Sequence, residues 1–147
     1  MFRGNYPTRV DEKGRLKLPA DFKRVMEEKQ YGETFYITSR DGVDVEIHPM
    51  KEWEEIERKI AAIPNSNPAK KKLMNYINYY GQTVDMDTQG RVLLPQLLRE
   101  KTSTLGDVLI FGMHTFLKVT NRENFVQMMD ESPMTAEDEQ ALESFGL

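Results

Sequence analysis

The apolar residues near the start of the chain first have the spacing of a strand and then that of a helix. Leu16 and Leu18 are separated by one residue, so they are expected on the face of a strand that points to a core. Arg15 and Lys17 would then point to solvent. A short helix is predicted next, and its apolar face is formed by Phe22, Val25 and Met26.

Two strands and a longer helix complete the first half of the chain. The segments Thr34–Ser39 and Asp44–His48 have strand character and are joined by the turn residues 40–42. A helix follows, with an apolar face made of Met50, Trp53, Ile56 and Ile60. Residues 64–68 are loop-like in composition, and 70–80 are predicted to form a second helix.

The second half repeats this order. A short helix is predicted around Leu97 and Leu98, and two strands at Val108–Phe111 and Phe116–Thr120 are expected to turn around Gly112. Thr120-x-x-Glu123 is the pattern of a capping box for a last helix. The apolar face of that helix contains Phe125, Met128 and Met129.

One motif occurs twice, at an offset of 76 residues. The first copy is DEKGRLKLP at 11–19, and the second is DTQGRVLLP at 87–95. We expect two tandem β-α-β-β-α repeats, at 1–63 and 81–130, with a linker and bridging helix at 64–80 and an acidic tail at 131–147. Each half is too small to bury a generous core alone, so the two are expected to pack as a pseudo-symmetric pair.

The residue types of the motif predict a tight turn followed by a strand. An Asp at its start (Asp11 and Asp87) can accept hydrogen bonds from the backbone of the turn. Glycine at the fourth position (Gly14 and Gly90) permits positive φ. The next residue in each copy is an arginine that could contact DNA, since Arg binds guanine edges in the major groove. The alternative is that each Arg only pairs with its own Asp and fixes the loop, and both roles are compatible.

The charge is unevenly distributed. The chain has 20 basic and 24 acidic residues, a net charge of −4. Residues 1–24 contain seven basic and three acidic residues, whereas 121–147 contain one basic and seven acidic residues. The net charge therefore does not exclude a nucleic-acid partner. There is no cysteine, which excludes disulfides and thiolate zinc sites and favours a cytoplasmic setting. Neither a signal peptide nor a membrane span is expected.

Several motifs in order resemble the MraZ family of bacterial transcriptional regulators. They are the opening Met1-Phe2-Arg3-Gly4, the two turns with their Leu-Pro endings, Pro49-x-x-x-Trp53, and the closing segment 134–147. The resemblance covers nearly the whole chain. It implies an α+β fold, an AbrB-like swapped-hairpin β-barrel with two repeats.

The resemblance also implies a function and a site. It implies a repressor of the division and cell-wall gene cluster, nucleoid-associated, that forms ring-shaped homo-oligomers on G-rich direct repeats of double-stranded DNA in its own promoter. Arg15 and Arg91 would contact DNA, with Lys13 and Lys17 beside them. Leu93 stands where the first copy has Lys17, so the second turn is expected to present less charge.

Other functions have weaker support. His48 and His114 lack the spacing of a metal site and are expected to be ordinary surface or strand-end residues. No catalytic or cofactor-binding motif occurs, so no enzyme, cofactor or small-molecule substrate is expected. The alternative function is that of an antitoxin-like protein-binding module of AbrB-type fold, which would act through the acidic tail. Two complete turns and a short tail favour DNA binding.

Overall fold

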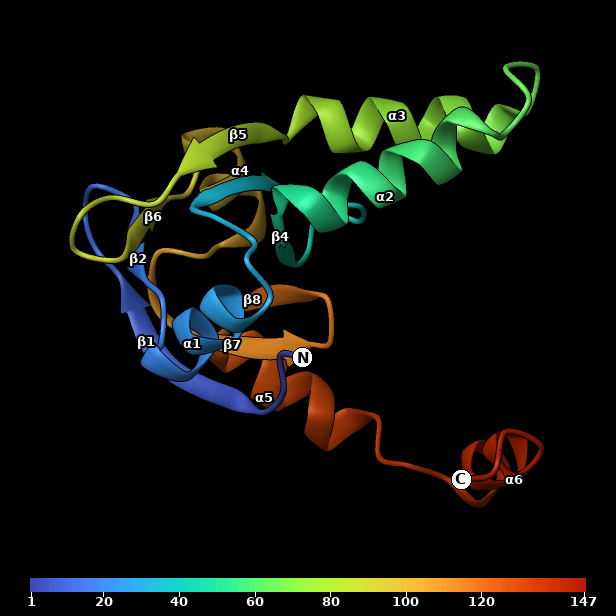
Figure 1. Cartoon of the computed structure of the whole chain (residues 1–147). Coiled ribbons are helices and arrows are strands. Elements are labelled where there is room, and N and C mark those ends of the chain that lie inside the picture. Colours follow the sequence, from blue (N-terminus) through green and yellow to red (C-terminus); the bar gives the residue numbers. More distant parts are fainter.

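The computed structural model describes all 147 residues and contains one eight-stranded sheet. The sheet curls into a nearly closed barrel (Figure 1). The strands are β1 (Asn5–Val10), β2 (Arg15–Lys17), β3 (Thr34–Thr38), β4 (Val45–Pro49), β5 (Gln82–Asp85), β6 (Arg91–Leu93), β7 (Gly106–Met113) and β8 (Phe116–Asn121). The helices are α1 (Ala20–Glu28), α2 (Met50–Ala61), α3 (Pro68–Tyr79), α4 (Gln96–Thr102), α5 (Arg122–Glu131) and α6 (Ala136–Glu143). The predicted α+β class and swapped-hairpin barrel are confirmed.

In the sheet, neighbouring pairs of strands come by turns from the first and the second half of the chain. Their order is β5-β3-β4-β8-β7-β1-β2-β6, and every pair is antiparallel. Four pairs join the first half to the second: β1 with β7, β2 with β6, β3 with β5, and β4 with β8. The two halves therefore share one core, and neither could bury its apolar face without the other.

The core contains the apolar alternation that the sequence predicts. Leu16 and Leu18 are fully buried, and so are their equivalents Val92 and Leu94 in the second half. Phe22 on α1 and Leu98 on α4 pack into the same core. Pro19 and Pro95 precede these two helices as N-cap residues.

Each half has one strand more than the sequence predicts, β1 in the first and β5 in the second. β1 has the sequence NYPTRV and β5 the sequence QTVD, and most of their side chains are not buried. Such segments have little apolar periodicity. Their strand conformation follows from pairing, of β1 with β7 and of β5 with β3.

The expected turn at Gly112 is wrong. Gly112 lies within β7, and the chain turns at His114 and Thr115, where His114 has φ +62°. Gly112 has a different role: its N–H donates to the carbonyl oxygen of Gly4 at 2.7 Å, and a Cβ at this position would overlap the backbone of Phe2 and Arg3. Glycine lets the N-terminal segment lie directly on β7 and place the buried Phe2 in the core.

The expected capping box at Thr120 and Glu123 is also wrong. Thr120 is buried within β8, and α5 is capped by Asn121, whose side chain accepts the N–H of Asn124 at 2.9 Å. The complete capping box of this chain belongs to α6, between Thr135 and Asp138.

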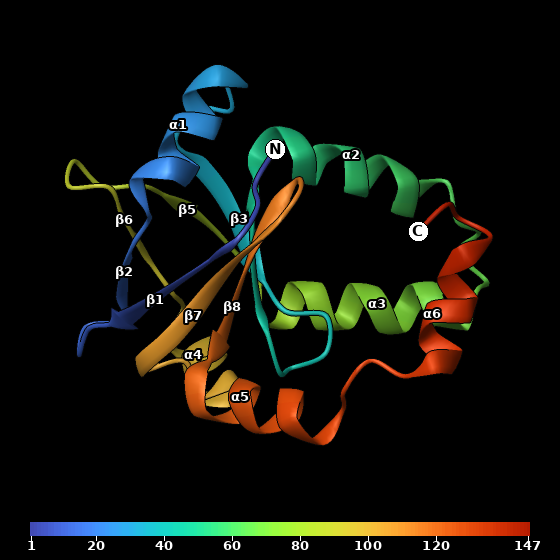
Figure 2. The same ribbon diagram turned by 90° about the horizontal axis from the view of Figure 1, so that it is seen from below.

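Two projections extend from the barrel, toward the same side in both views (Figures 1 and 2). One is the hairpin of α2 and α3, which has a small core of its own, formed by Trp53, Ile60 and Ile77. The other is the C-terminal arm, residues 132–147, which continues from α5 and ends in α6. No helix of the structure is long and apolar enough to cross a membrane.

Candidate nucleic-acid interface

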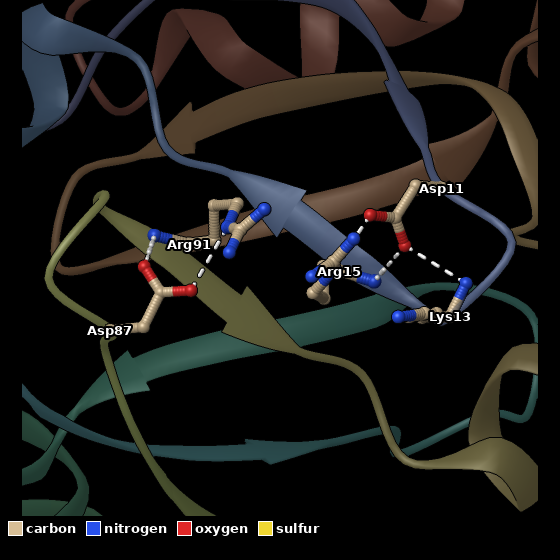
Figure 3. A network of polar contacts seen from close by, with 5 residues as sticks. All are labelled: Asp11, Lys13, Arg15, Asp87 and Arg91. Atoms are coloured by element: carbon tan, nitrogen blue, oxygen red, sulfur yellow. Dashed lines mark hydrogen bonds and ion pairs between the residues drawn. The ribbon is translucent and has the colours of Figure 1, made fainter.

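The two oxygens of the Asp11 carboxylate have separate roles in the first turn, residues 11–15. Oδ1 accepts the backbone N–H groups of Lys13 at 3.0 Å and of Arg15 at 2.8 Å. Oδ2 accepts the side-chain Nε–H of Arg15 at 2.7 Å (Figure 3). Gly14 has φ +87°, a conformation that glycine adopts without strain. One carboxylate thus fixes both the turn and the direction of the Arg15 side chain.

The second turn, residues 87–91, has the same geometry. Asp87 Oδ1 accepts the N–H groups of Gln89 at 2.8 Å and of Arg91 at 2.9 Å, and its Oδ2 accepts Arg91 Nε–H at 2.9 Å (Figure 3). Gly90 has φ +76°. The motif that recurs at an offset of 76 residues therefore forms the same set of hydrogen bonds in both copies.

Hydrogen bonding favours the charged form of both aspartates. The backbone N–H of Arg15 is the largest cause that lowers the pKa of Asp11, and the Arg15 side chain adds to it. Arg91 lowers the pKa of Asp87 in the same way. Partial desolvation opposes this shift at both positions without reversing it. Each Asp is therefore a carboxylate at neutral pH and each turn is a closed ion pair.

The two arginines lie on one two-stranded ribbon. β2 and β6 are antiparallel neighbours, and Leu16 is directly opposite Val92. Both of these side chains are buried, so the residues on either side of them point outward. The outward face of the ribbon carries Arg15, Lys17, Arg91 and Leu93. The ribbon is related to itself by an approximate two-fold axis, because Leu18 N–H donates to Gly90 O and Leu94 N–H donates to Gly14 O.

The register of the ribbon corrects the expectation that the second turn presents less charge. Lys17 is directly opposite Arg91, and Leu93 is directly opposite Arg15. The lysine of the first copy therefore supplements the arginine of the second turn. The loss of a cation at position 93 instead leaves an exposed leucine beside Arg15.

Two further cations lie against the glycines of the turns, and the sequence analysis did not identify them as site residues. A Cβ on Gly14 would overlap the guanidinium of Arg99 on α4, and a Cβ on Gly90 would lie 2.6 Å from Nζ of Lys23 on α1. Each cation comes from the half that does not contain the turn. Lys23 and Arg99 are themselves 76 residues apart, so the repeat offset was the signal that could have found them.

The cations divide evenly between the two turns. The first turn has Arg15, Lys13 and Arg99, and the second has Arg91, Lys17 and Lys23. Lys13 belongs to the first turn alone, because Gln89 takes its place in the second. The geometry that brings them together is the exchange of strands between the halves.

The histidines lie elsewhere. His48 is buried, stacked against Phe116 at 4.6 Å between ring centroids, and its Nε2 lies 2.8 Å from Glu46. It is at a strand end, as expected, but it belongs to the interior and not to the surface. His114 is in the turn between β7 and β8. No group of three His, Cys, Asp or Glu side chains is arranged to hold a metal ion.

Comparison with known proteins agrees with this architecture. A family model described as "MraZ protein, putative antitoxin-like" matches residues 1–75 and 81–145, and each matched segment contains one of the two turns. The chain belongs to the MraZ family. The match extends beyond the turns to both projections of the barrel.

MraZ proteins from several bacteria resemble the chain over most of their length. The protein named "Transcriptional regulator MraZ" from Acidobacterium capsulatum is 65% identical over 147 residues, covering 100% of both chains. The protein of the same name from Koribacter versatilis is 51% identical over 147 residues, again 100% of both. A more distant one, from Carboxydothermus hydrogenoformans, is 35% identical over 125 residues, 84% of this chain and 82% of that one.

Proposed function

We propose that this protein is a DNA-binding transcriptional regulator that represses its own promoter by inserting the β2–β6 ribbon into the major groove. The observation that carries the proposal is the fixed position of Arg15 and Arg91 on one outward face of a single two-stranded ribbon. The major groove of B-DNA admits a two-stranded ribbon. The relatives named above, described as transcriptional regulators, support the same conclusion.

The ion pairs leave the arginines able to contact bases. In each turn the Asp carboxylate takes the Nε–H, and no hydrogen bond within the chain engages the two terminal Nη groups. A guanidinium can donate from both Nη groups, and guanine offers two acceptors, O6 and N7, in the major groove. Because the side chains are already held in place, binding loses less conformational entropy than it would for a free arginine.

The lysines and Arg99 suit a different kind of contact. Lys17 lies on the ribbon and Lys13 in the turn that precedes it, while Lys23 and Arg99 lie against Gly90 and Gly14. Cations at the edge of a groove-binding element contact phosphates, which positions the protein without reading sequence. We assign base contacts to Arg15 and Arg91 and backbone contacts to the surrounding cations.

A single copy offers few such contacts, and the remainder of the chain is acidic. Several copies bound to repeated sites would gain affinity by acting together. We therefore infer ring-shaped self-association on G-rich direct repeats, spaced by about one helical turn of roughly 10 base pairs so that neighbouring copies read the same face. The target that fits the family is the division and cell-wall gene cluster, with the protein associated with the nucleoid.

Fluorescence anisotropy on the DNA upstream of the protein's own gene tests this proposal. Titrations over a salt series should show tighter binding than to scrambled DNA of the same composition. The slope of log K against log salt counts the phosphate contacts, at about 0.9 for each. Equal affinity for both DNAs would contradict sequence-specific regulation. It would leave the antitoxin-like alternative, in which the C-terminal arm binds a protein and the turns have only a structural role.

A further inference from the structure

The C-terminal arm carries apolar side chains that its own chain does not cover. Phe145 and Leu147 are 78% and 81% exposed, and α6 has no buried residue. The arm nevertheless has a complete capping box, so its sequence specifies a helix. A helix this short is marginal in water unless it packs against something. The arm therefore has the properties of a segment that docks.

A groove beside the α2–α3 hairpin offers a suitable surface. It has a volume of about 360 Å³ and lies where the hairpin meets β4 and β8. Its apolar wall includes Trp53, Ile56, Ile63 and Leu73. Two cations, Arg40 and Lys59, line the same groove. The one acidic residue there, Glu46, already faces His48.

We infer that this groove binds the C-terminal arm of a second copy of the chain. The charges are complementary: residues 132–147 contain four acidic and no basic side chains, whereas Arg40 and Lys59 line the groove. Leu142, Phe145 and Leu147 would pack against the apolar wall of the groove. The inference rests on the self-association proposed above and identifies the surfaces that produce it.

The arm is poorly placed to reach the groove of its own chain. α5 is held on the barrel by the contact of Phe125 with Phe111, 4.7 Å between ring centroids. Only residues 132–135 separate α5 from α6, and four residues span at most about 14 Å. The arm and the α2–α3 hairpin leave the barrel separately and do not meet (Figure 1).

Docking onto a second copy explains why the assembly would be a ring. Each chain donates one arm and receives one, so donor and receiver surfaces differ. An interface of this head-to-tail kind closes into a ring when the rotation between copies permits. The DNA-binding ribbon takes no part in it.

The absence of native cysteine allows a direct test by disulfide cross-linking of the full chain. One chain carries Phe145→Cys, and a second chain of different tag length carries Ile63→Cys in the groove. Val43→Cys, at an exposed position in the β3–β4 loop, replaces Ile63→Cys in the control. Docking raises the effective concentration of the two thiols, so cross-linking in the first pair should be on the order of 100-fold faster than in the control.

Three other results would overturn the inference, and each would show which of its steps is wrong. A disulfide that forms only within one chain carrying both substitutions would show that the arm docks on its own barrel. Sedimentation of an intact oligomer with no preferential cross-link would leave self-association standing and refute this interface. Monomers at every concentration would refute the self-association itself, while DNA binding by the ribbon would still be measurable by anisotropy.

Discussion

Gly14 lies directly against the guanidinium of Arg99, a residue from the other half of the chain. The symmetric contact is made by Gly90 and Lys23, whose Nζ is the atom a Cβ would meet. Both turns therefore depend on a cation supplied from the opposite repeat. The glycines serve two purposes at once: a positive φ and room for that cation.

Replacement of Gly14 by Ala should destabilise the protein for both reasons. The left-handed conformation alone costs a non-glycine residue roughly 1–2 kcal/mol. The overlap with Arg99 adds to this cost, because a Cβ at position 14 would meet both the guanidinium and the buried Nε of Arg99 at 2.3–2.6 Å. Urea unfolding should show a larger loss for Gly14→Ala than for Gly90→Ala, where the flexible end of Lys23 can shift.

A double variant separates the two causes. Arg99→Ala in the Gly14→Ala background should remove the overlap and leave only the conformational cost, so the two substitutions should be clearly non-additive. Additive losses would mean that the Gly14–Arg99 contact has no energetic importance.

Substitutions of Asp11 can distinguish the two roles of its carboxylate. Asp11→Asn keeps an oxygen for the two backbone N–H groups but loses the acceptor for Arg15 Nε, so the turn should survive and the arginine should become mobile. Asp11→Ala loses both, and should cost roughly 1–2 kcal/mol of stability for two backbone hydrogen bonds. Unfolding measurements and Arg Nε–H NMR signals check the two effects. Equal stability of both variants would contradict the role assigned to Oδ1.

Leu93→Lys should increase the affinity of the first turn for DNA. The new lysine would lie directly opposite Arg15, as Lys17 lies opposite Arg91. One additional phosphate contact should raise the salt slope by about 0.9 for each bound copy without changing sequence preference. Met129→Lys on α5 is the matched control. Met129 is 56% exposed and Leu93 is 51% exposed, so both substitutions add a lysine at a similarly exposed position. An equal increase in the control would indicate a general charge effect.

The turns should remain closed over the whole neutral range. The pKa values of Asp11 and Asp87 lie below the ordinary value of 3.8, so the folded state favours the carboxylate form. The resulting stability is complete above the pKa of the unfolded chain and is lost as pH falls through the lower folded pKa. DNA affinity should therefore show no step from either Asp between about pH 5 and 8.

NMR titration of the carboxyl carbons provides the measurement. Asp44 serves as an internal comparison, because burial raises its pKa above 3.8. Asp11 and Asp87 should titrate below that value and Asp44 above it. The reverse order would show that the ion pairs of the turns do not form in solution.

Much of the fold was predictable because the repeated motif and the apolar spacing around it are patterns within short segments of the chain. Leu16 and Leu18 alternate clearly, and helix α2 has an apolar face that the sequence shows directly. β1 and β5 lack such a pattern, since their strand conformation depends on partners far along the chain. Gly112 misled the prediction for a related reason: glycine marks turns, but here it marks the place where the N-terminal backbone lies on a strand.

The residues that form each turn could be predicted from the sequence. The residues that each turn receives from the other half of the chain could not. The spacing of Asp, Gly and Arg points to a closed turn in each copy. The pairing of Lys17 with Arg91, and the position of Arg99 beneath Gly14, depend on how the halves exchange strands. The register of β2 with β6 shows that Lys17 shares a turn with Arg91, and the packing of α1 and α4 shows that Lys23 lies against the second turn and Arg99 against the first.

An affinity comparison tests most directly whether Arg15 and Arg91 read DNA. Arg15→Ala/Arg91→Ala is compared with Arg58→Ala/Arg122→Ala, which removes two arginines outside the ribbon and so changes the net charge equally. Anisotropy should show that the first variant loses its preference for the operator over scrambled DNA, while the second retains it, and both should sediment as the wild type does. Retention of operator preference by Arg15→Ala/Arg91→Ala would contradict the account.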